Sequence, residues 1–223
     1  MTALTVRPMR LEDVAQAVEI EREAFPAQWP PTPFKRELQN RLAHYLVLCQ
    51  GGEVWEAPAR QGVSLLLDKV GRLLARRPVE GGSNHPDQPF IVGTVGFWLL
   101  YDESHITTIA VKESHRRRGL GELLLHASME MAISMRSRVV TLEVRATNYP
   151  AQALYQKYGF QRVGLRRGYY TDNNEDAIIM TTDPLDSAPF RERFQQLKLD
   201  LARRLNIAPL PEGWPLSEAS PAS

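Results

Sequence analysis

The chain has 223 residues, of which 43% are hydrophobic and 24% charged, a composition typical of one globular domain or one domain with additions. Its formal net charge of +1 gives no overall field that favours nucleic acid or a membrane surface. A single cysteine, Cys49, excludes an intrachain disulfide and a cysteine-based metal site. The chain begins without an apolar leader segment and lacks the run of about 18 apolar residues that a membrane span requires, so we expect a cytoplasmic protein.

The first part of the chain predicts two strands with two helices between them. Alternating side chains predict strands at Leu4–Arg7 and Tyr45–Cys49. The proline-rich segment Pro26–Pro33 separates the helices, and Thr32 followed by Pro33 is typical of an N-cap and a first helical residue. The expected apolar faces are Leu11, Val14, Val18 and Phe25 in the first helix, and Phe34, Leu38 and Leu42 in the second.

Residues 50–90 differ in composition and indicate an insertion between two strands. Gly51 and Gly52 are expected to turn the chain, an amphipathic helix is expected over Val63–Leu74, and Pro78–Pro89 has the composition of a flexible linker. This helix could shield the sheet edge, cover part of a cleft or mediate self-association, with packing on its own domain as the default. A long strand then follows at 91–100, where Gly93 and Gly96 indicate a bulge or a close neighbour.

The stretch His105–Leu125 combines a strand, a basic loop and the start of a helix. The β-branched run Ile106–Val111 predicts a buried strand, and Arg116–Arg118 with Gly119 and Gly121 forms the loop. The apolar residues at helical spacing are Leu120, Leu123, Leu124, Ala127 and Met131. Because the first N–H groups of a helix lack intrahelical partners and the helix dipole favours negative charge there, the stretch predicts a pyrophosphate site. Neither a P-loop nor a complete dinucleotide fingerprint is present, and an ordinary helix start with surface arginines is an equal alternative by chemistry alone.

Three more strands and two more helices are expected after this stretch. The strands are Val139–Val144, Phe160–Leu165 and Ala177–Met180. The helix faces are Ala151, Leu154, Tyr155 and Tyr158, ended by Gly159, and Phe190, Phe194, Leu197, Leu201 and Leu205. The tail from Ala208 carries four prolines and is expected to be irregular. This order of elements predicts a mixed α/β domain around one sheet.

Several polar residues have structural explanations as well as functional ones. Glu143 ends an apolar strand, so it needs solvent or a salt bridge, for instance to Arg145 or Arg166. Structural alternatives are a helix cap for Asn148, a core aromatic for Tyr155, a buried hydrophobe for Cys49 and polar strand ends for His105 and His115. The five histidines form no metal-ligand pattern, so no metal is expected.

Three segments together resemble a known family. RRRGLGELLL (Arg116–Leu125) matches the signature Q/R-x-x-G-x-G/A of the GCN5-related N-acetyltransferases, the GNAT superfamily. LEVRATNYPAQALYQKYGF followed by RRGYYTDNNEDAIIM resembles its bacterial ribosomal-protein-alanine N-acetyltransferases. The resemblance covers residues 4–49 and 91–181. It implies an α/β GNAT fold, a mixed central sheet flanked by helices, over residues 1–182, with the 50–90 insertion and a C-terminal helix and irregular tail over 183–223.

The resemblance implies a binding mode for acetyl-CoA. The cofactor would lie in a V between the strand ending at Val111 and the strand ending at Glu143. The backbone of Ile109–Val111 would pair with the pantetheine and donate an N–H to the thioester oxygen, where negative charge develops. The residues implied to bind the cofactor are Ile109, Ala110, Val111, Arg116, Arg117, Arg118, Gly119, Leu120, Gly121, Glu122 and Asn148.

The resemblance also implies catalytic roles. Glu143 would be the general base, directly or through a water, and Tyr155 would protonate the departing CoA thiolate. Acetyl transfer would be direct, without an acyl-enzyme. The residues that would border the acceptor groove are Arg166, Arg167, Tyr169, Tyr170 and Trp29.

The expected function is acetyl transfer from acetyl-CoA to the N-terminal amine of a protein, with a ribosomal protein that starts with alanine as substrate. The alternatives are an acetyltransferase for a small amine, such as a polyamine, an aminoglycoside or an amino acid, and a non-catalytic acyl-CoA-binding module. A lid or an occluding tail formed by the added segments would change which amine can enter. No metal, no membrane and no direct nucleic-acid partner is expected.

Overall fold

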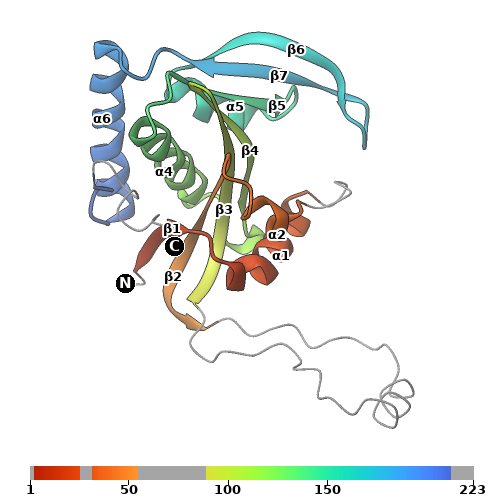
Figure 1. Ribbon diagram of the computed structural model, residues 1–223. Coiled ribbons are helices and arrows are strands. Elements are labelled where there is room, and N and C mark those ends of the chain that lie inside the picture. The colour runs from red at the N-terminus through yellow and green to blue at the C-terminus, as the bar shows by residue number, and fades with distance from the viewer. Residues whose placement is uncertain (1–2, 26–31, 55–88, 212–223) are drawn as a thin grey trace.

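The computed structural model describes residues 3–25, 32–54 and 89–211, and the structural statements below concern these residues (Figure 1). The strands are β1 (Leu4–Pro8), β2 (Ala43–Val54), β3 (Pro89–Leu100), β4 (Glu103–Val111), β5 (Val139–Arg145), β6 (Phe160–Tyr170) and β7 (Glu175–Thr182). The helices are α1 (Val14–Ala24), α2 (Phe34–Glu37), α4 (Leu120–Ser134), α5 (Tyr149–Lys157) and α6 (Ala188–Leu205), with short 3₁₀ turns at Leu11–Asp13 and Glu113–His115. No described helix is both long and apolar enough to cross a bilayer.

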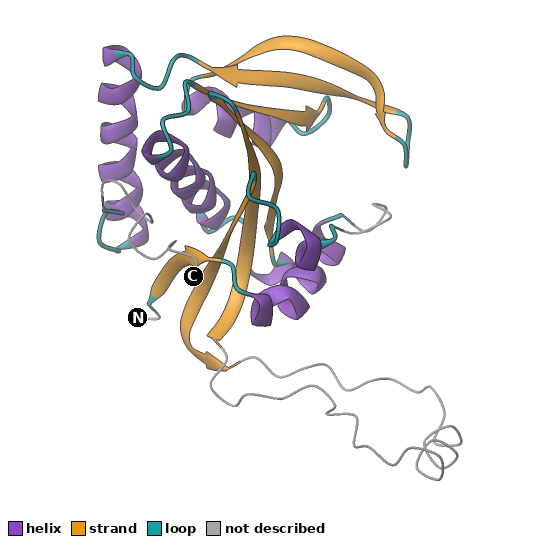
Figure 2. Cartoon of the chain, in the orientation of Figure 1, coloured by secondary structure: helices purple, strands orange, loops and turns teal. Residues whose placement is uncertain are grey.

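One sheet runs through the molecule. Its seven strands lie in the order β1-β2-β3-β4-β5-β7-β6. The β4–β5 pair is parallel, whereas the other neighbours are antiparallel, so the sheet is mixed as the sequence predicts. Figure 2 shows the strands as a twisted central layer with helices on both sides. The expected fold class is confirmed.

Two hydrophobic clusters occupy the two faces of the sheet. On one face, α1 and α2 cover β2, β3 and β4 through residues that include Ile20, Phe34, Tyr45 and Val47. On the other face, α4, α5 and α6 pack together through residues that include Leu124, Leu142, Tyr158 and Phe194. The C-terminal helix α6 therefore lies on the side of the sheet opposite α1 and α2 (Figure 1).

The helix α4 is buried on nearly every side. The expected apolar face is buried, and so are Leu125, His126, Met129 and Glu130 on other faces of the helix. The sheet covers one side and α6 the other, through Phe190, Phe194 and Leu201. The predicted face of α6 is thereby confirmed, because it is the surface that packs on this core.

The expected face of the first helix is partly wrong. Leu11 is 62% exposed, because it lies in the 3₁₀ turn before α1 rather than in the helix. The Asp13 carboxylate accepts hydrogen bonds from the backbone N–H of Arg10 and from the guanidinium of Arg7, which fixes this turn. The buried face of α1 then consists of Val14, Gln16, Ala17, Ile20 and Glu21.

The second helix is shorter than predicted. It ends at Glu37, Leu38 is its C-cap, and Leu42 is exposed in a later turn. Thr32 does not cap it, and Pro33 occupies the N-cap position. The backbone N–H and the hydroxyl of Thr32 donate instead to the buried carboxylate of Glu21 in α1.

The predictions made for the glycines are partly wrong and partly confirmed. Gly51 and Gly52 do not turn the chain, because β2 continues to Val54 with an irregular register beyond Gln50. A close neighbour at Gly96 is confirmed, since a Cβ there would lie 2.2 Å from the Tyr45 ring. The expected helix at 63–74, most of the linker at 78–89, Trp29 and the tail beyond 211 lie outside the described residues.

Candidate active site

The parallel strands β4 and β5 separate part of the way along their length. They pair from Glu103 with Val139 to Ile106 with Leu142, and in the described structure their pairing stops there. At that point β4 has an extra residue, Thr107, because Gly96 pairs with Thr108 and the next residue of β3 pairs with Ile106. Such a bulge bends a strand away from its neighbour. It opens the V that the resemblance implies.

Beyond the bulge, β4 keeps a strand partner on one side. Ile109, Ala110 and Val111 pair with Val95, Thr94 and Gly93 of β3. No described strand pairs with their other edge. An extended ligand can add to such an edge through backbone hydrogen bonds. One acceptor of this segment is already used, because Arg116 Nε donates to Val111 O over 3.2 Å.

The loop before α4 has the backbone of an anion site. Gly119 is the N-cap with a φ of 79°, and Arg117 also has a positive φ of 61°. A left-handed conformation is uncommon for a residue with a side chain and is often associated with function. No side chain caps the helix start, so the N–H groups of Leu120, Gly121 and Glu122 point out of the first turn without an intrahelical acceptor. Arg116 is turned away from this turn and donates to the carbonyls of Val111 and Glu23.

Glu143 lies where β5 leaves β4, and its side chain is 7% exposed. Its Oε2 is 2.6 Å from Nε2 of His105, and its Oε1 is 2.9 Å from Nε of Arg166. The hydrogen bond from His105 holds the pKa of Glu143 below its usual value despite burial, with help from Arg166. The carboxylate is therefore charged and tightly held at neutral pH. The alternative of a salt bridge to Arg166 is confirmed, and the one to Arg145 is wrong.

His105 is the functional candidate that the sequence interpretation missed. It was expected to be only a polar strand end, yet it pairs with Thr141 across the parallel strands. Side chains two residues apart on a strand share a face, so His105 lies diagonally opposite Glu143. The alternation of His105 with its neighbours could have indicated its face, but its contact with Glu143 depends on which strands are adjacent.

Tyr155 comes from α5 and is partly buried, with its ring centroid 5.6 Å from that of Phe160. Burial raises the pKa of its phenol well above the usual value, and the nearby Tyr170 adds to this effect. The phenol is therefore protonated at neutral pH, as a general acid must be. No hydrogen bond joins Tyr155 to Glu143 in the described structure, and the role of Tyr155 as an acid stays a prediction.

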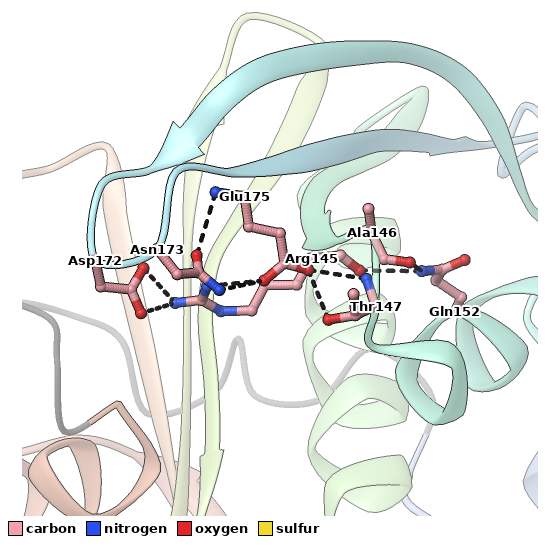
Figure 3. A network of polar contacts seen from close by, with 7 residues as sticks. All are labelled: Arg145, Ala146, Thr147, Gln152, Asp172, Asn173 and Glu175. Carbon is pink, nitrogen blue, oxygen red and sulfur yellow. Dashed lines mark hydrogen bonds and ion pairs between the residues drawn. The ribbon is translucent and has the colours of Figure 1, made fainter.

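Arg145 ties the turn of the β6–β7 hairpin to β5 (Figure 3). Its guanidinium donates to both carboxylate oxygens of Asp172, at 3.0 and 2.9 Å, and to Asn173 and Glu175 at 3.1 Å each. The same guanidinium lies 4.0 Å from the centroid of the Tyr170 ring. The tip of the hairpin is thus held by one side chain of the strand that carries the candidate base.

The loop between β5 and α5 joins the same network. Thr147 donates its backbone N–H and its hydroxyl to Oε1 of Glu175, and these bonds lower the pKa of Glu175 to about 2. Gln152 donates to the carbonyls of Arg145 and Ala146. The hairpin tip and this loop therefore form one connected unit (Figure 3).

Asn148 caps α5, as its structural alternative predicts. Its Oδ1 accepts a hydrogen bond of 3.2 Å from the backbone N–H of Ala151. This contact uses the carbonyl oxygen of the side chain, so a role of Asn148 in cofactor binding stays a prediction.

The remaining candidates are placed as follows. Cys49 is buried in β2, and burial raises the pKa of its thiol, which disfavours the thiolate that a nucleophile needs. Tyr169 is half exposed on β6, with the guanidinium of Arg166 5.7 Å from its ring centroid. Arg167 is exposed on the same strand. Within residues 3–25, 32–54 and 89–211, no group of three or more His, Cys, Asp or Glu side chains could hold a metal ion.

Known proteins are similar to this chain in sequence and in structure. Residues 76–160 match the model of the acetyltransferase (GNAT) family. A Bacillus subtilis protein, named as a candidate ribosomal protein bS18-alanine N-acetyltransferase, is 37% identical over 180 residues, which cover 80% of this chain and 95% of that protein. The N-alpha-acetyltransferase RimI of Mycobacterium tuberculosis is 33% identical over 82% of this chain and 94% of its own length.

A solved structure shares the fold. The crystal structure of the ribosomal-protein-S18-alanine N-acetyltransferase from Escherichia coli matches with a TM-score of 0.59 and 26% sequence identity. The match covers 83% of this chain and 96% of that chain.

Proposed function

Because this chain belongs to the GNAT family of acetyltransferases, we propose that it transfers an acetyl group from acetyl-CoA to the N-terminal amine of a protein, and specifically of a ribosomal protein that begins with alanine. The names of the relatives support the class of acceptor, because they give either a ribosomal-protein alanine or a protein N-terminus as the site of acetylation. Such a substrate implies that the enzyme acts in the cytoplasm.

The observation that carries the proposal is the position of Glu143 at the point where the V between β4 and β5 begins. Glu143 is the first residue of β5 beyond the β4–β5 pairing, and Ile109–Val111 on the diverging part of β4 would hold the pantetheine arm. The α4 N-terminus lies at the end of the same loop, where it would hold the pyrophosphate. The pantetheine arm of acetyl-CoA joins the pyrophosphate to the thioester, so the thioester carbonyl would lie at the end of the β4 segment that is nearer to Glu143. A backbone N–H of the β4 segment would stabilise the negative charge that develops on its oxygen.

The amine must lose a proton to attack. A protein α-amino group has a pKa of about 8, so a substantial part is protonated at neutral pH. The charged Glu143 carboxylate attracts this cation and accepts its proton, directly or through a water, while His105 keeps the carboxylate oriented. The hydrogen bond from His105 lowers the pKa of Glu143, which keeps the carboxylate charged and makes it a weaker base than an unperturbed carboxylate.

The second proton transfer completes the reaction. The amine nitrogen forms the new bond to the carbonyl carbon, and the carbon–sulfur bond then breaks. The phenol of Tyr155 donates its proton to the departing thiolate, which its raised pKa permits because the phenol stays protonated until that moment. The transfer is direct, because Cys49 is buried in the core of the α1 face.

The acceptor class can be tested with a matched set of amines. We expect acetylation of a peptide with an N-terminal alanine, measured as a gain of one acetyl group by mass spectrometry and as CoA release. The same peptide with a blocked N-terminus and an internal lysine is the control and should not react. A higher kcat/KM for spermidine, an aminoglycoside or a free amino acid than for any peptide would overturn the proposal.

A further inference from the structure

The C-terminal helix α6 runs antiparallel to α4, so its last turn lies beside the first turn of α4 (Figure 1). Lys198 Nζ is 2.7 Å from Glu130 Oε1. Nearer the C-terminus of α6, Arg204 Nη2 is 2.7 Å from Glu122 Oε2. At the very end, a Cβ added to Gly119 would lie 3.1 Å from Cδ2 of Leu205. The extension therefore contacts the loop that we assign to the pyrophosphate.

Glu122 occupies an unusual place for a carboxylate in such a site. It is the third residue of α4, where an acidic side chain commonly folds back onto the free N–H groups of the helix start. A carboxylate in that position is also stabilised by the positive end of the helix dipole. A phosphate group bound at the same helix start would need the same N–H groups and would be repelled by the charge.

In this protein the carboxylate is held elsewhere. The Glu122 side chain is 9% exposed, with Oε1 2.6 Å from Lys157 Nζ of α5 and 3.2 Å from the Tyr158 hydroxyl, and with Oε2 on Arg204 of α6. Burial alone would raise the pKa of Glu122, but the hydrogen bonds from Lys157 and Arg204 outweigh burial and lower it. The side chain is thus charged, and two cations hold it towards α5 and α6.

We propose that Arg204 is a positioning residue for acetyl-CoA. Together with Lys157 it keeps Glu122 away from the N–H groups at the start of α4 and neutralises its charge, so that α6 sets the affinity for the cofactor. This inference rests on the cofactor site of the proposed function.

The test is equilibrium binding of CoA, which needs no acceptor amine. We expect Arg204→Met to weaken CoA binding about fivefold at low ionic strength, with a smaller effect at high salt because screening reduces the repulsion. The value of kcat at saturating acetyl-CoA and the KM of the peptide should not change. Arg203→Met is the matched control, because this side chain is 72% exposed and, within the described part of the chain, contacts its own helix at Asp200 and at the carbonyl of Leu199. This variant should bind CoA like the parent protein.

A second change separates positioning from direct contact. In the double variant Glu122→Gln/Arg204→Met no charge remains to be held away, so CoA affinity should return to within about twofold of the parent value. Unchanged affinity in Arg204→Met, or no recovery in the double variant, would overturn the inference. Dephospho-CoA, which lacks the 3′-phosphate, identifies a direct contact of Arg204 with that phosphate. If such a contact exists, Arg204→Met does not weaken the binding of this ligand. If the parent protein binds CoA but acetylates no amine, the proposed function fails while this inference stands or falls by its own measurements.

Discussion

Replacing Glu143 by glutamine is the most direct test of the catalytic assignment. The change keeps the shape of the side chain but removes the charge that faces His105 and Arg166. A positioned general base contributes about 10²–10⁴-fold to a rate, so we expect kcat to fall by that order. The KM for acetyl-CoA should change little, since the proposed phosphate and pantetheine contacts lie on β4 and α4.

The cost to stability should be smaller than for a fully buried ion pair. Breaking such a pair costs about 3–5 kcal/mol, but the Arg166 side chain is 52% exposed and can be solvated by water. His105 keeps a hydrogen-bond partner in the glutamine amide. We therefore expect a loss of about 1–2 kcal/mol in the free energy of unfolding, which leaves the variant folded.

Steady-state CoA release, with urea unfolding in parallel, measures both quantities. Glu103→Gln at the opposite end of β4 makes the same chemical change away from the V and should keep parental kinetics. A Glu143→Gln enzyme that is folded and retains more than about a third of the parental kcat would refute the role of Glu143 as base, since this loss is far below that of a general base.

Three further changes probe other parts of the structure. Tyr155→Phe should lower kcat by about 10–100-fold with unchanged CoA affinity. An acetyl donor with a more acidic thiol should recover part of the rate, because its thiolate leaves more readily without a proton. Glu175→Gln should remove part of the acid sensitivity of the fold: the folded pKa of about 2 lies below the ordinary value of 4.5, so this group stabilises the protein above pH 4.5 and loses that contribution as the pH falls towards 2. Melting temperatures of parent and variant across that range should converge at the acid end; parallel curves would contradict this. Gly96→Ala should lower the free energy of unfolding, measured with urea, by at least about 1–3 kcal/mol, because the added Cβ would overlap the Tyr45 ring. An unchanged urea midpoint would show that the ring moves freely.

The sequence predicted those elements whose pattern is local. The strand–loop–helix unit around Gly119 and the apolar face of α6 were both found as expected, because alternation and helical spacing report directly on burial. The second helix was predicted too long, because its apolar spacing continued past Glu37 while the chain had already turned. The hydrogen bonds of Thr32 to Glu21 were not predictable either, since they join residues of two different elements.

In the candidate site, too, local features could be predicted from the sequence, whereas contacts between distant residues could not. The backbone at the start of α4 follows from nearby glycines, and Glu143 stands out as an acidic residue in an apolar strand. The partner His105 became visible only with the strand order, because the two residues are 38 positions apart in the chain. The role of α6 could not be predicted from its amphipathic pattern, which indicates that it packs but not that Arg204 meets Glu122.

The network around Arg145 has a consequence for how an acceptor is selected. Folding itself fixes the tip of the β6–β7 hairpin to the β5–α5 loop, so this wall of the proposed acceptor side is rigid before any peptide arrives. Binding then does not have to order the wall, and the corresponding loss of chain entropy does not weaken the complex. A rigid wall also cannot adapt to a differently shaped acceptor. A change of substrate in evolution would therefore occur through side-chain replacement on the hairpin, at positions such as Arg167 and Tyr169, rather than through movement of its backbone.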